Sequence, residues 1–376
     1  MHALAGAATI LSSVPPLQIL SDLTRLASVA ARGKRRSRDV ARFLLDRASA
    51  VAELQEEIAT RSYTPGIGRT FWVRDPKLRL IYALPFRDRV VQHLLMAQTL
   101  PFLEPSLAPQ SYACRVGKGT HRCLERAAEW TRRRAYVLRL DMRKFFPSID
   151  HAILRRLLQR TTPLPWRWLR DRFLDAPYVG EQVQYHFTGD DLLTPLQRPH
   201  GLPIGSLTSQ LWANAYLSPL DHLLASHLGL GSFVRYCDDI LVFDDDPGRL
   251  EDALRHLLAG SEALRLRLHP VKTRLFRTTD PVSFLGFVLQ RHGDAVRIRL
   301  RHDNVERMRQ RVRHMKLLYA TGALGPEEVL SRLRAWLAHA GHGHTQRLLE
   351  REAENWRFQK SPVTGRARHE GVEAAR

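Results

Sequence analysis

The segment Phe233-Val234-Arg235-Tyr236-Cys237-Asp238-Asp239-Ile240-Leu241-Val242-Phe243 decides the fold of this chain. Its two runs of apolar, aromatic and β-branched residues, Phe233–Tyr236 and Ile240–Phe243, are typical of strands. Asp238 and Asp239 lie between the two runs. The segment therefore predicts a β-hairpin with carboxylates at its tip.

A third carboxylate follows a similar apolar run further upstream. Tyr136–Leu140 predicts a buried strand that leads directly into Asp141. Carboxylates at the ends of adjacent strands can hold two Mg²⁺ ions about 3.5–4 Å apart, which activate a hydroxyl and neutralise a leaving pyrophosphate. Each Asp could instead cap a turn, because Asp is favoured in turns. Residue type alone leaves both interpretations open.

The charge of the chain favours a polyanionic partner. Its formal net charge is +20, and the basic residues are spread over several segments, such as Arg32–Arg36, Arg132–Arg134 and Arg307–Lys316. No stretch approaches the roughly 20 apolar residues that a membrane span needs, so we expect nucleic acid and no membrane partner. The three cysteines form no Cys-x-x-Cys pair, and no signal peptide is expected, which favours a reducing cytoplasm.

Periodicity outlines the other elements. We expect a β-hairpin from residues 70–73 and 78–84, a second from 282–290 and 295–300, and a loop over 189–203. Helical patterns cover residues 22–60, 90–103, 150–158, 166–174, 206 onward, 250–258, 305–319 and 327–340, and the chain beyond 350 is expected to be frayed.

Local sequences around the carboxylates resemble those of the reverse transcriptase family. Leu140–Ile149 resembles the first palm motif, Tyr236–Asp239 the Tyr-x-Asp-Asp motif, and Gly201–Gln210 the Gly-x-x-x-Ser motif that opens the long palm helix. Further blocks in the family's order are His269–Lys272, Phe284–Gly286, Lys77–Ile81, Asp88–Gln92, Ser111–Arg115 and Gly117–His121. The resemblance covers roughly residues 30 to 350, and its collinear order favours a metal site over turn caps.

The resemblance implies an α+β fold, shaped as a right-hand polymerase with fingers, palm and helical thumb. The palm would be an antiparallel sheet with helices in a ferredoxin-like core. The expected boundaries are an N-terminal segment over 1–30, fingers over 31–135, palm over 136–290 with an inserted loop at about 175–203, thumb over 291–350, and a flexible tail over 351–376.

The resemblance also assigns the catalytic residues. Asp141 and Asp238 would bind two Mg²⁺ ions, for which Mn²⁺ could substitute, with the Met142 backbone carbonyl completing a site. Asp239 matches the second motif carboxylate, whose metal contact in the family is less direct. The implied partners are template RNA, a DNA or RNA primer and dNTPs, and a small accessory protein is also considered.

Other residues match nucleotide-binding and strand-binding positions. Phe146, five residues after Asp141, matches an aromatic steric gate against a 2′-hydroxyl, although ordinary core packing beside Phe145 would also explain it. The remaining nucleotide-binding candidates are Lys77 and Arg79, Ile204, Gly205 and Gln210, and Lys272, which matches a proton donor to pyrophosphate. Primer or template contacts are assigned to Tyr236, to Phe284, Leu285 and Gly286, and to Arg309 and Arg313 on a basic helix, although a solvated face would also explain that helix.

The third block departs from the usual family pattern. Most members have Gln-Gly and Ser-Pro where this chain has Ile204-Gly205 and Ser209-Gln210. The departure resembles reverse transcriptases of diversity-generating retroelements, which copy RNA with errors at adenine, and also phage-defence reverse transcriptases. An RNA-binding scaffold without activity is a third alternative, against which the intact Asp set argues.

Three other signals are given a structural interpretation. Gly117–Thr120 lacks the upstream glycine of a phosphate-binding loop. His339, His342 and His344 are read as a polar helix end, and the acidic pairs at 190–191 and 244–246 as caps or solvated turns.

Overall fold

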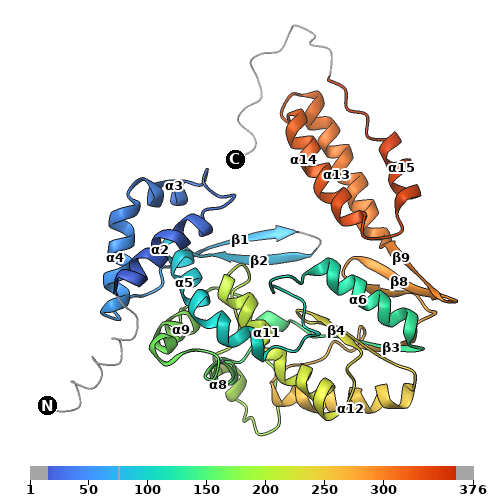
Figure 1. Cartoon of the computed structure of the whole chain (residues 1–376), viewed down its shortest axis with the longest axis horizontal. Helices are drawn as coiled ribbons and strands as arrows, with labels where there is room; N and C mark the ends of the chain where they lie inside the picture. Colours follow the sequence, from blue (N-terminus) through green and yellow to red (C-terminus); the bar gives the residue numbers. More distant parts are fainter. Residues whose placement is uncertain (1–15, 75–76, 361–376) are drawn as a thin grey trace. The chain divides into compact units, whose positions relative to one another are not determined.

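The computed structural model describes residues 16–74 and 77–360. The chain divides into two compact units (Figure 1). The first runs to residue 130 and continues from 134 to 277, and the second begins at residue 278 and includes 131–133. The predicted tip of the first hairpin, at residues 75–76, lies outside the described residues.

Helices form the start of the first unit. α2 (Pro16–Ala30), α3 (Arg38–Leu45), α4 (Arg47–Ala59) and α5 (Phe86–Leu103) pack around fully buried apolar residues such as Leu23 and Leu94. The expectation of one helical pattern over 22–60 is thus corrected to three helices. The chain turns at Gly33, whose φ of 70° suits glycine, and again at Asp46 between α3 and α4.

The predicted first hairpin is confirmed as β1 (Arg69–Arg74) paired with β2 (Leu78–Ala83). Every residue of β1 is exposed, including the large side chains of Phe71 and Trp72. The hairpin is joined to the rest of the unit at its base, where the Tyr82 amide donates a 3.0 Å hydrogen bond to the Ile204 carbonyl.

A four-stranded antiparallel sheet forms the centre of this unit. Its order is β4 (Phe233–Tyr236), β5 (Asp239–Asp244), β3 (Tyr136–Asp141) and β6 (Arg274–Arg277). The predicted carboxylate hairpin and the strand that leads into Asp141 are therefore confirmed. β6 was not expected, because its two apolar residues lie between Arg274 and Arg277 and give little periodic signal.

Helices cover this sheet. α12 (Pro247–Ala263) packs on β3, β5 and β6, and α11 (Leu207–His222) packs on α5, α8 (His151–Leu158) and α12. The remaining elements of the unit are η2 (Glu104–Ser106), α6 (Thr120–Arg133), α7 (Phe145–Ser148), η3 (Leu164–Trp166), α9 (Arg167–Leu174), α10 (Thr194–Gln197) and η4 (Leu223–His227). The short α10 interrupts the loop expected over 189–203.

The second unit joins a small sheet to helices. β7 (Val282–Phe284), β8 (Phe287–His292) and β9 (Ala295–Leu300) form an antiparallel meander, followed by α13 (His302–Ala320), α14 (Pro326–Ala340) and α15 (Gln346–Glu354). The expectation of a single strand over 282–290 is wrong. Leu285 and Gly286 have φ values of 49° and 87°, so the chain reverses between β7 and β8.

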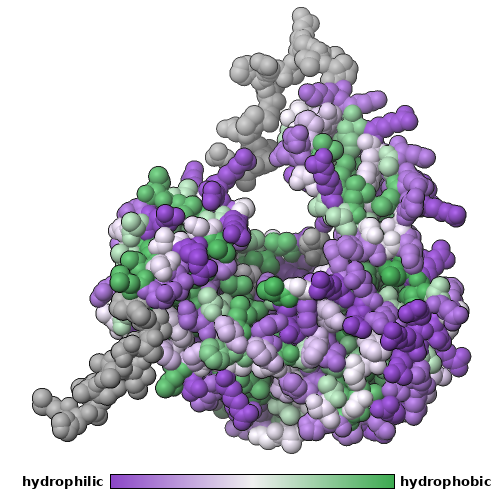
Figure 2. Space-filling view, in the orientation of Figure 1, coloured by the Kyte–Doolittle hydropathy of each residue, from purple (hydrophilic) through white to green (hydrophobic). Residues whose placement is uncertain are grey.

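The spacing of apolar residues in α13 and α14 predicts their packing correctly. Val312 and Met315 of α13 are buried, as are Val329 and Leu333 of α14. Figure 2 shows apolar residues flanked by hydrophilic ones on this unit. The frayed tail expected beyond residue 350 is wrong as far as Glu354, because α15 continues to that residue and buries Glu352. Residues 361–376 lie outside the described part.

These elements confirm an α+β fold with antiparallel sheets. The names fingers, palm and thumb, and their boundaries, stay predictions. The compact division falls between Arg277 and Thr278, whereas the predicted palm extends to residue 290. Within the described residues, no helix is long and apolar enough to cross a membrane.

Candidate active site

Strand pairing brings the predicted carboxylates to one end of the central sheet. Asp141 at the end of β3 is directly opposite Asp239 at the start of β5. Tyr236 at the end of β4 pairs with Asp239, and Cys237 and Asp238 form the tip between them. Cys237 takes a left-handed conformation, with φ of 53°, which allows the tight reversal. Asp141 and Asp239, 98 positions apart in the sequence, thus become neighbours through the register of β3 and β5.

The environment of the carboxylates opposes their ionisation. Burial raises the pKa of Asp238, and the neighbouring Asp141 raises it further. Burial likewise raises the pKa of Asp239 to about 7, a rise that Arg139 opposes and the other two carboxylates increase. Three anions held this close need compensating positive charge.

Two basic side chains supply part of that charge. The Lys272 ammonium lies 2.6 Å from Asp141 Oδ1, and Arg139 Nε lies 3.4 Å from Asp239 Oδ1. Arg79, on β2, is close enough to lower the pKa of Asp238. The predicted Lys272 therefore contacts a carboxylate directly, whereas Arg79 is exposed and acts on Asp238 through its charge, and Lys77 is exposed at the edge of the described hairpin.

The donor set suits a hard divalent cation. Carboxylate oxygens are the ligands that Mg²⁺ prefers, and their mutual repulsion would be relieved by bound cations. Among residues 16–74 and 77–360, no group of three or more His, Cys, Asp or Glu side chains is already arranged around one metal position. The Lys272 ammonium donates a 2.6 Å hydrogen bond to Asp141 Oδ1. Metal ligation by Asp141, Asp238, Asp239 and the Met142 carbonyl stays a prediction.

The segment after Asp141 is tied to the third sequence block. The Leu202 amide donates to the Phe146 carbonyl at 2.9 Å, and the Gly201 amide to the Ile149 carbonyl at 2.7 Å. Gly205 has a φ of 110°, and an added Cβ would lie 3.0 Å from Ile81 of β2, so glycine is required there. The structure thus joins the segments that carry Phe146, Ile204 and Gly205.

Gln210 lies one turn further along, on α11. Its side chain is exposed, and its Oε1 accepts a 3.5 Å hydrogen bond from Cys114 Sγ. The start of α11 is fixed by Gln92 of α5, whose amide nitrogen donates to the hydroxyls of Ser206 and Thr208. These contacts connect the Asp88–Gln92 block of the sequence to the third block.

The residues predicted to contact primer and template lie in different environments. Phe284 is only 1% exposed and packs in the core of the second unit, while Leu285 and Gly286 form the turn beside it. Tyr236 accepts a hydrogen bond from the Thr120 hydroxyl. The roles of these residues in strand binding stay predictions.

The two arginines of α13 that were predicted to contact the template–primer differ in their ion pairs. Arg309 pairs with the buried Glu352 through two nitrogens, with the shortest contact at 2.7 Å, and also with Glu306. Arg313 is exposed and makes no ion pair within the described residues. Arg309 therefore holds α15 against α13, whereas Arg313 is available to a phosphate.

The competing acid clusters are structural, as predicted. Asp191 Oδ1 accepts the amides of Leu193 and Thr194 at the start of α10, and Asp190 pairs with Arg198. Asp246 accepts the Gly248 amide at 2.8 Å and caps α12. The histidines lie at the end of α14, which stops at Ala340, and the His339 ring packs on Phe287.

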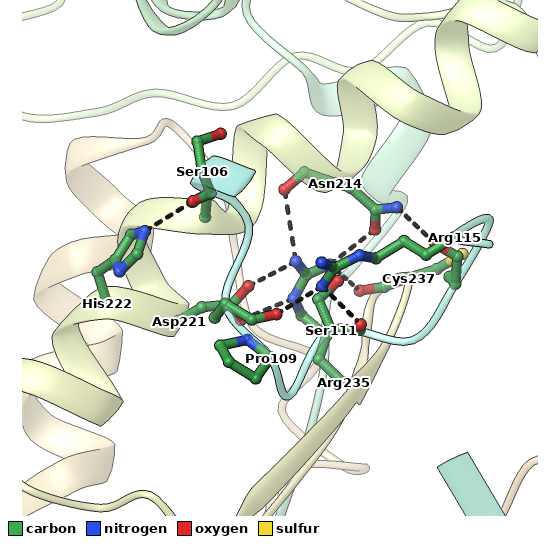
Figure 3. Close-up of polar contacts among 12 residues, drawn as sticks. Ser106, Pro109, Ser111, Arg115, Asn214, Asp221, His222, Arg235 and Cys237 are labelled. Atoms are coloured by element: carbon green, nitrogen blue, oxygen red, sulfur yellow. Dashed lines mark hydrogen bonds and ion pairs between the residues drawn. The ribbon is translucent and has the colours of Figure 1, made fainter. Parts of the chain in front are cut away.

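Sequence reasoning missed a buried polar cluster behind the hairpin tip. Arg235 of β4 is completely buried and contacts Asp221 and Asn214 of α11 (Figure 3). A signal was present, because a charged residue at an inward position of an apolar strand requires a buried partner. The sequence alone did not indicate which residue that partner would be.

Comparisons with known proteins agree with this arrangement. The family model described as "Reverse transcriptase (RNA-dependent DNA polymerase)" matches residues 74–289, more than half of the chain. The chain is also 22% identical over 292 residues to Protein YkfC of Escherichia coli (strain K12), which covers 63% of this chain and 70% of that protein. The matched residues include Asp141, Asp238 and Asp239 with the sheet that carries them. The chain belongs to the reverse transcriptase family.

Proposed function

We propose that this protein is an RNA-directed DNA polymerase that adds dNTPs to a primer paired with template RNA. The observation that carries the proposal is the convergence of three carboxylates at the paired ends of β3 and β5. Structural turn caps would be satisfied by nearby amides, as at Asp191 and Asp246. Asp141, Asp238 and Asp239 instead lie together, and burial, with the neighbouring carboxylates adding to it, raises the pKa values of Asp238 and Asp239.

The surrounding residues suit phosphoryl transfer, which depends mainly on positioning and charge stabilisation. Two Mg²⁺ ions, when bound, would activate the primer hydroxyl and stabilise charge on the pyrophosphate. The charge of Arg79 on β2 lowers the pKa of Asp238, and this side chain would hold the triphosphate. Lys272 contacts Asp141 and would give a proton to the departing pyrophosphate.

The test is extension of a labelled primer on a defined RNA template with dNTPs and Mg²⁺. We expect full-length product that disappears when EDTA removes the metal. Binding of the primed template without any extension, under a range of Mg²⁺ and Mn²⁺ concentrations, would support the inactive scaffold instead. The Asp238→Ala variant then shows whether the extension comes from this site or from a contaminating polymerase.

We further propose that Ile204 makes the enzyme error-prone at template adenine. Its backbone is fixed by Tyr82, and its side chain is partly exposed where the nascent base pair would lie. An apolar side chain there offers no hydrogen bond with which to test nucleotide placement. Selectivity that depends on a polar contact is lost when the contact is absent.

Replacing Ile204 with Gln should lower misincorporation at template adenine. Restoring one hydrogen bond predicts roughly a 3- to 10-fold change, measured by sequencing cDNA copied from a defined RNA. Ile67→Gln is the matched control, since Ile67 is 90% exposed and lies outside the third block. An unchanged adenine error rate in the Ile204 variant would contradict the proposed role.

A further inference from the structure

Arg235 lies at the centre of a buried polar cluster one strand position before the Tyr-x-Asp-Asp segment. Its Nε and one terminal nitrogen bind the two oxygens of Asp221 at 2.7 and 2.6 Å. The other terminal nitrogen donates to Asn214 Oδ1 at 3.1 Å and to the Cys237 carbonyl at 3.2 Å. Figure 3 shows the guanidinium between α11 and the hairpin.

This cluster by itself adds little net stability to the folded protein. Arg235 and Asp221 are both fully buried, and removing two charges from water costs about as much as their attraction returns. A guanidinium differs from an apolar side chain in its rigid fork of five donors, which fixes its partners in direction. An arginine whose guanidinium binds Asp221, Asn214 and the Cys237 carbonyl therefore fixes the positions of these groups relative to one another.

The contact with Cys237 concerns the carboxylates directly. The Cys237 carbonyl belongs to the peptide unit that joins Cys237 to Asp238. Cys237 is in the left-handed region, which disfavours residues other than glycine. A hydrogen bond from a buried donor holds the peptide in this orientation, and the orientation sets the direction of the Asp238 side chain.

The same cluster reaches the other side of the site. Asn214 Nδ2 donates to the Ala113 carbonyl at 2.7 Å, and the adjacent Cys114 contacts Gln210. Arg235 is itself paired along its backbone with the loop that carries these residues, through Gln110 and Tyr112. Buried contacts of Asn214 thus connect α11 to the turn that carries Asp238, and the exposed Cys114–Gln210 contact extends the connection to the start of the helix.

We propose that Arg235 is a positioning residue that fixes the Cys237–Asp238 peptide, and through it the direction of the Asp238 carboxylate toward bound metal. The inference rests on the proposed function for the assignment of Asp238. Its own content, a turn held by Arg235, is a property of the metal-free protein and can be measured without catalysis.

The test compares Arg235→Lys with Arg170→Lys. Lysine keeps the positive charge of Arg235 but lacks the fork that binds Asp221 and Cys237 together. Arg170 is the matched control, because its side chain is 5% exposed and its guanidinium pairs with the Asp171 carboxylate on α9. Both variants are compared well below their melting temperatures.

Two measurements are made on each variant. The first is hydrogen–deuterium exchange of the metal-free protein over residues 236–240. The second is Mn²⁺ binding followed by electron paramagnetic resonance. We expect Arg235→Lys to exchange faster in this segment and to bind Mn²⁺ roughly 10- to 100-fold more weakly, as when support for a metal ligand is lost. Arg170→Lys should lower the melting temperature and change neither quantity.

Unchanged exchange and Mn²⁺ affinity in Arg235→Lys would overturn the inference, as would an equal change in Arg170→Lys. If Arg235→Lys does not fold, Asn214→Ala replaces it, since Asn214 accepts from the same nitrogen that reaches Cys237. No weakening of Mn²⁺ binding in that variant would also overturn it. Failure of the proposed function appears differently, as wild-type protein that does not extend primers while the exchange difference persists.

Discussion

Asp238→Ala is expected to lower the rate of primer extension on RNA by at least about 1,000-fold, a larger loss than the roughly 10- to 100-fold seen when only the support of a metal ligand is removed. Asp238 stands at the hairpin tip beside Asp141, and its pKa is raised by burial and by that neighbour. Under the proposed function, a carboxylate that is kept there despite the cost of ionising it would bind the metal ions. Single-nucleotide incorporation at saturating dNTP measures the effect.

The control removes an aspartate near the opposite end of the same hairpin strand. Asp246 caps α12 two residues after β5 ends. Asp246→Ala should cost about 1 kcal/mol of stability through the lost cap and leave the extension rate unchanged. Because removal of a repelled carboxylate relieves strain, Asp238→Ala should not lower the melting temperature. Wild-type extension by Asp238→Ala would show that catalysis occurs elsewhere.

The core of the site could be predicted because it is encoded locally. Two short apolar runs around Asp238-Asp239 specify a hairpin, and a third run places Asp141 at a strand end. The pairing of β3 with β5 followed from the family resemblance, since no periodicity states which strands are neighbours. The structure also makes Asp239 a closer partner of Asp141 than the sequence implied, because these two residues are in register.

The features that were missed depend on contacts distant in the sequence. Arg235 is 14 residues from Asp221 and 21 from Asn214, and only the packing of α11 against β4 brings them together. The last helix is another case. α15 looked like a polar tail, but Glu352 is neutralised by Arg309, 43 residues earlier. A polar helix held by buried ion pairs lacks the apolar stripe that periodicity detects.

Phe146→Ala should admit ribonucleotides. The ring is partly buried and stacks edge-on against Phe145 at 5.5 Å, while the Phe146 carbonyl is held by Leu202. A backbone fixed in this way would keep the ring at the 2′-position of an incoming nucleotide. Its removal is expected to lower the preference for dNTPs over rNTPs roughly 10- to 200-fold, the range for exclusion of a small group by shape. Competing single incorporations of dATP and ATP measure this preference.

Phe145→Ala separates the steric gate from core packing. Phe145 is only 3% exposed, so its truncation should cost about 3–5 kcal/mol of stability and leave sugar selection unchanged. Phe146→Ala should show the reverse pattern, with a small change in melting temperature and a large loss of discrimination. Should Phe146→Ala lose stability as Phe145→Ala does and still reject rNTPs, the ring is a core residue. Selection against the 2′-hydroxyl would then belong to another side chain.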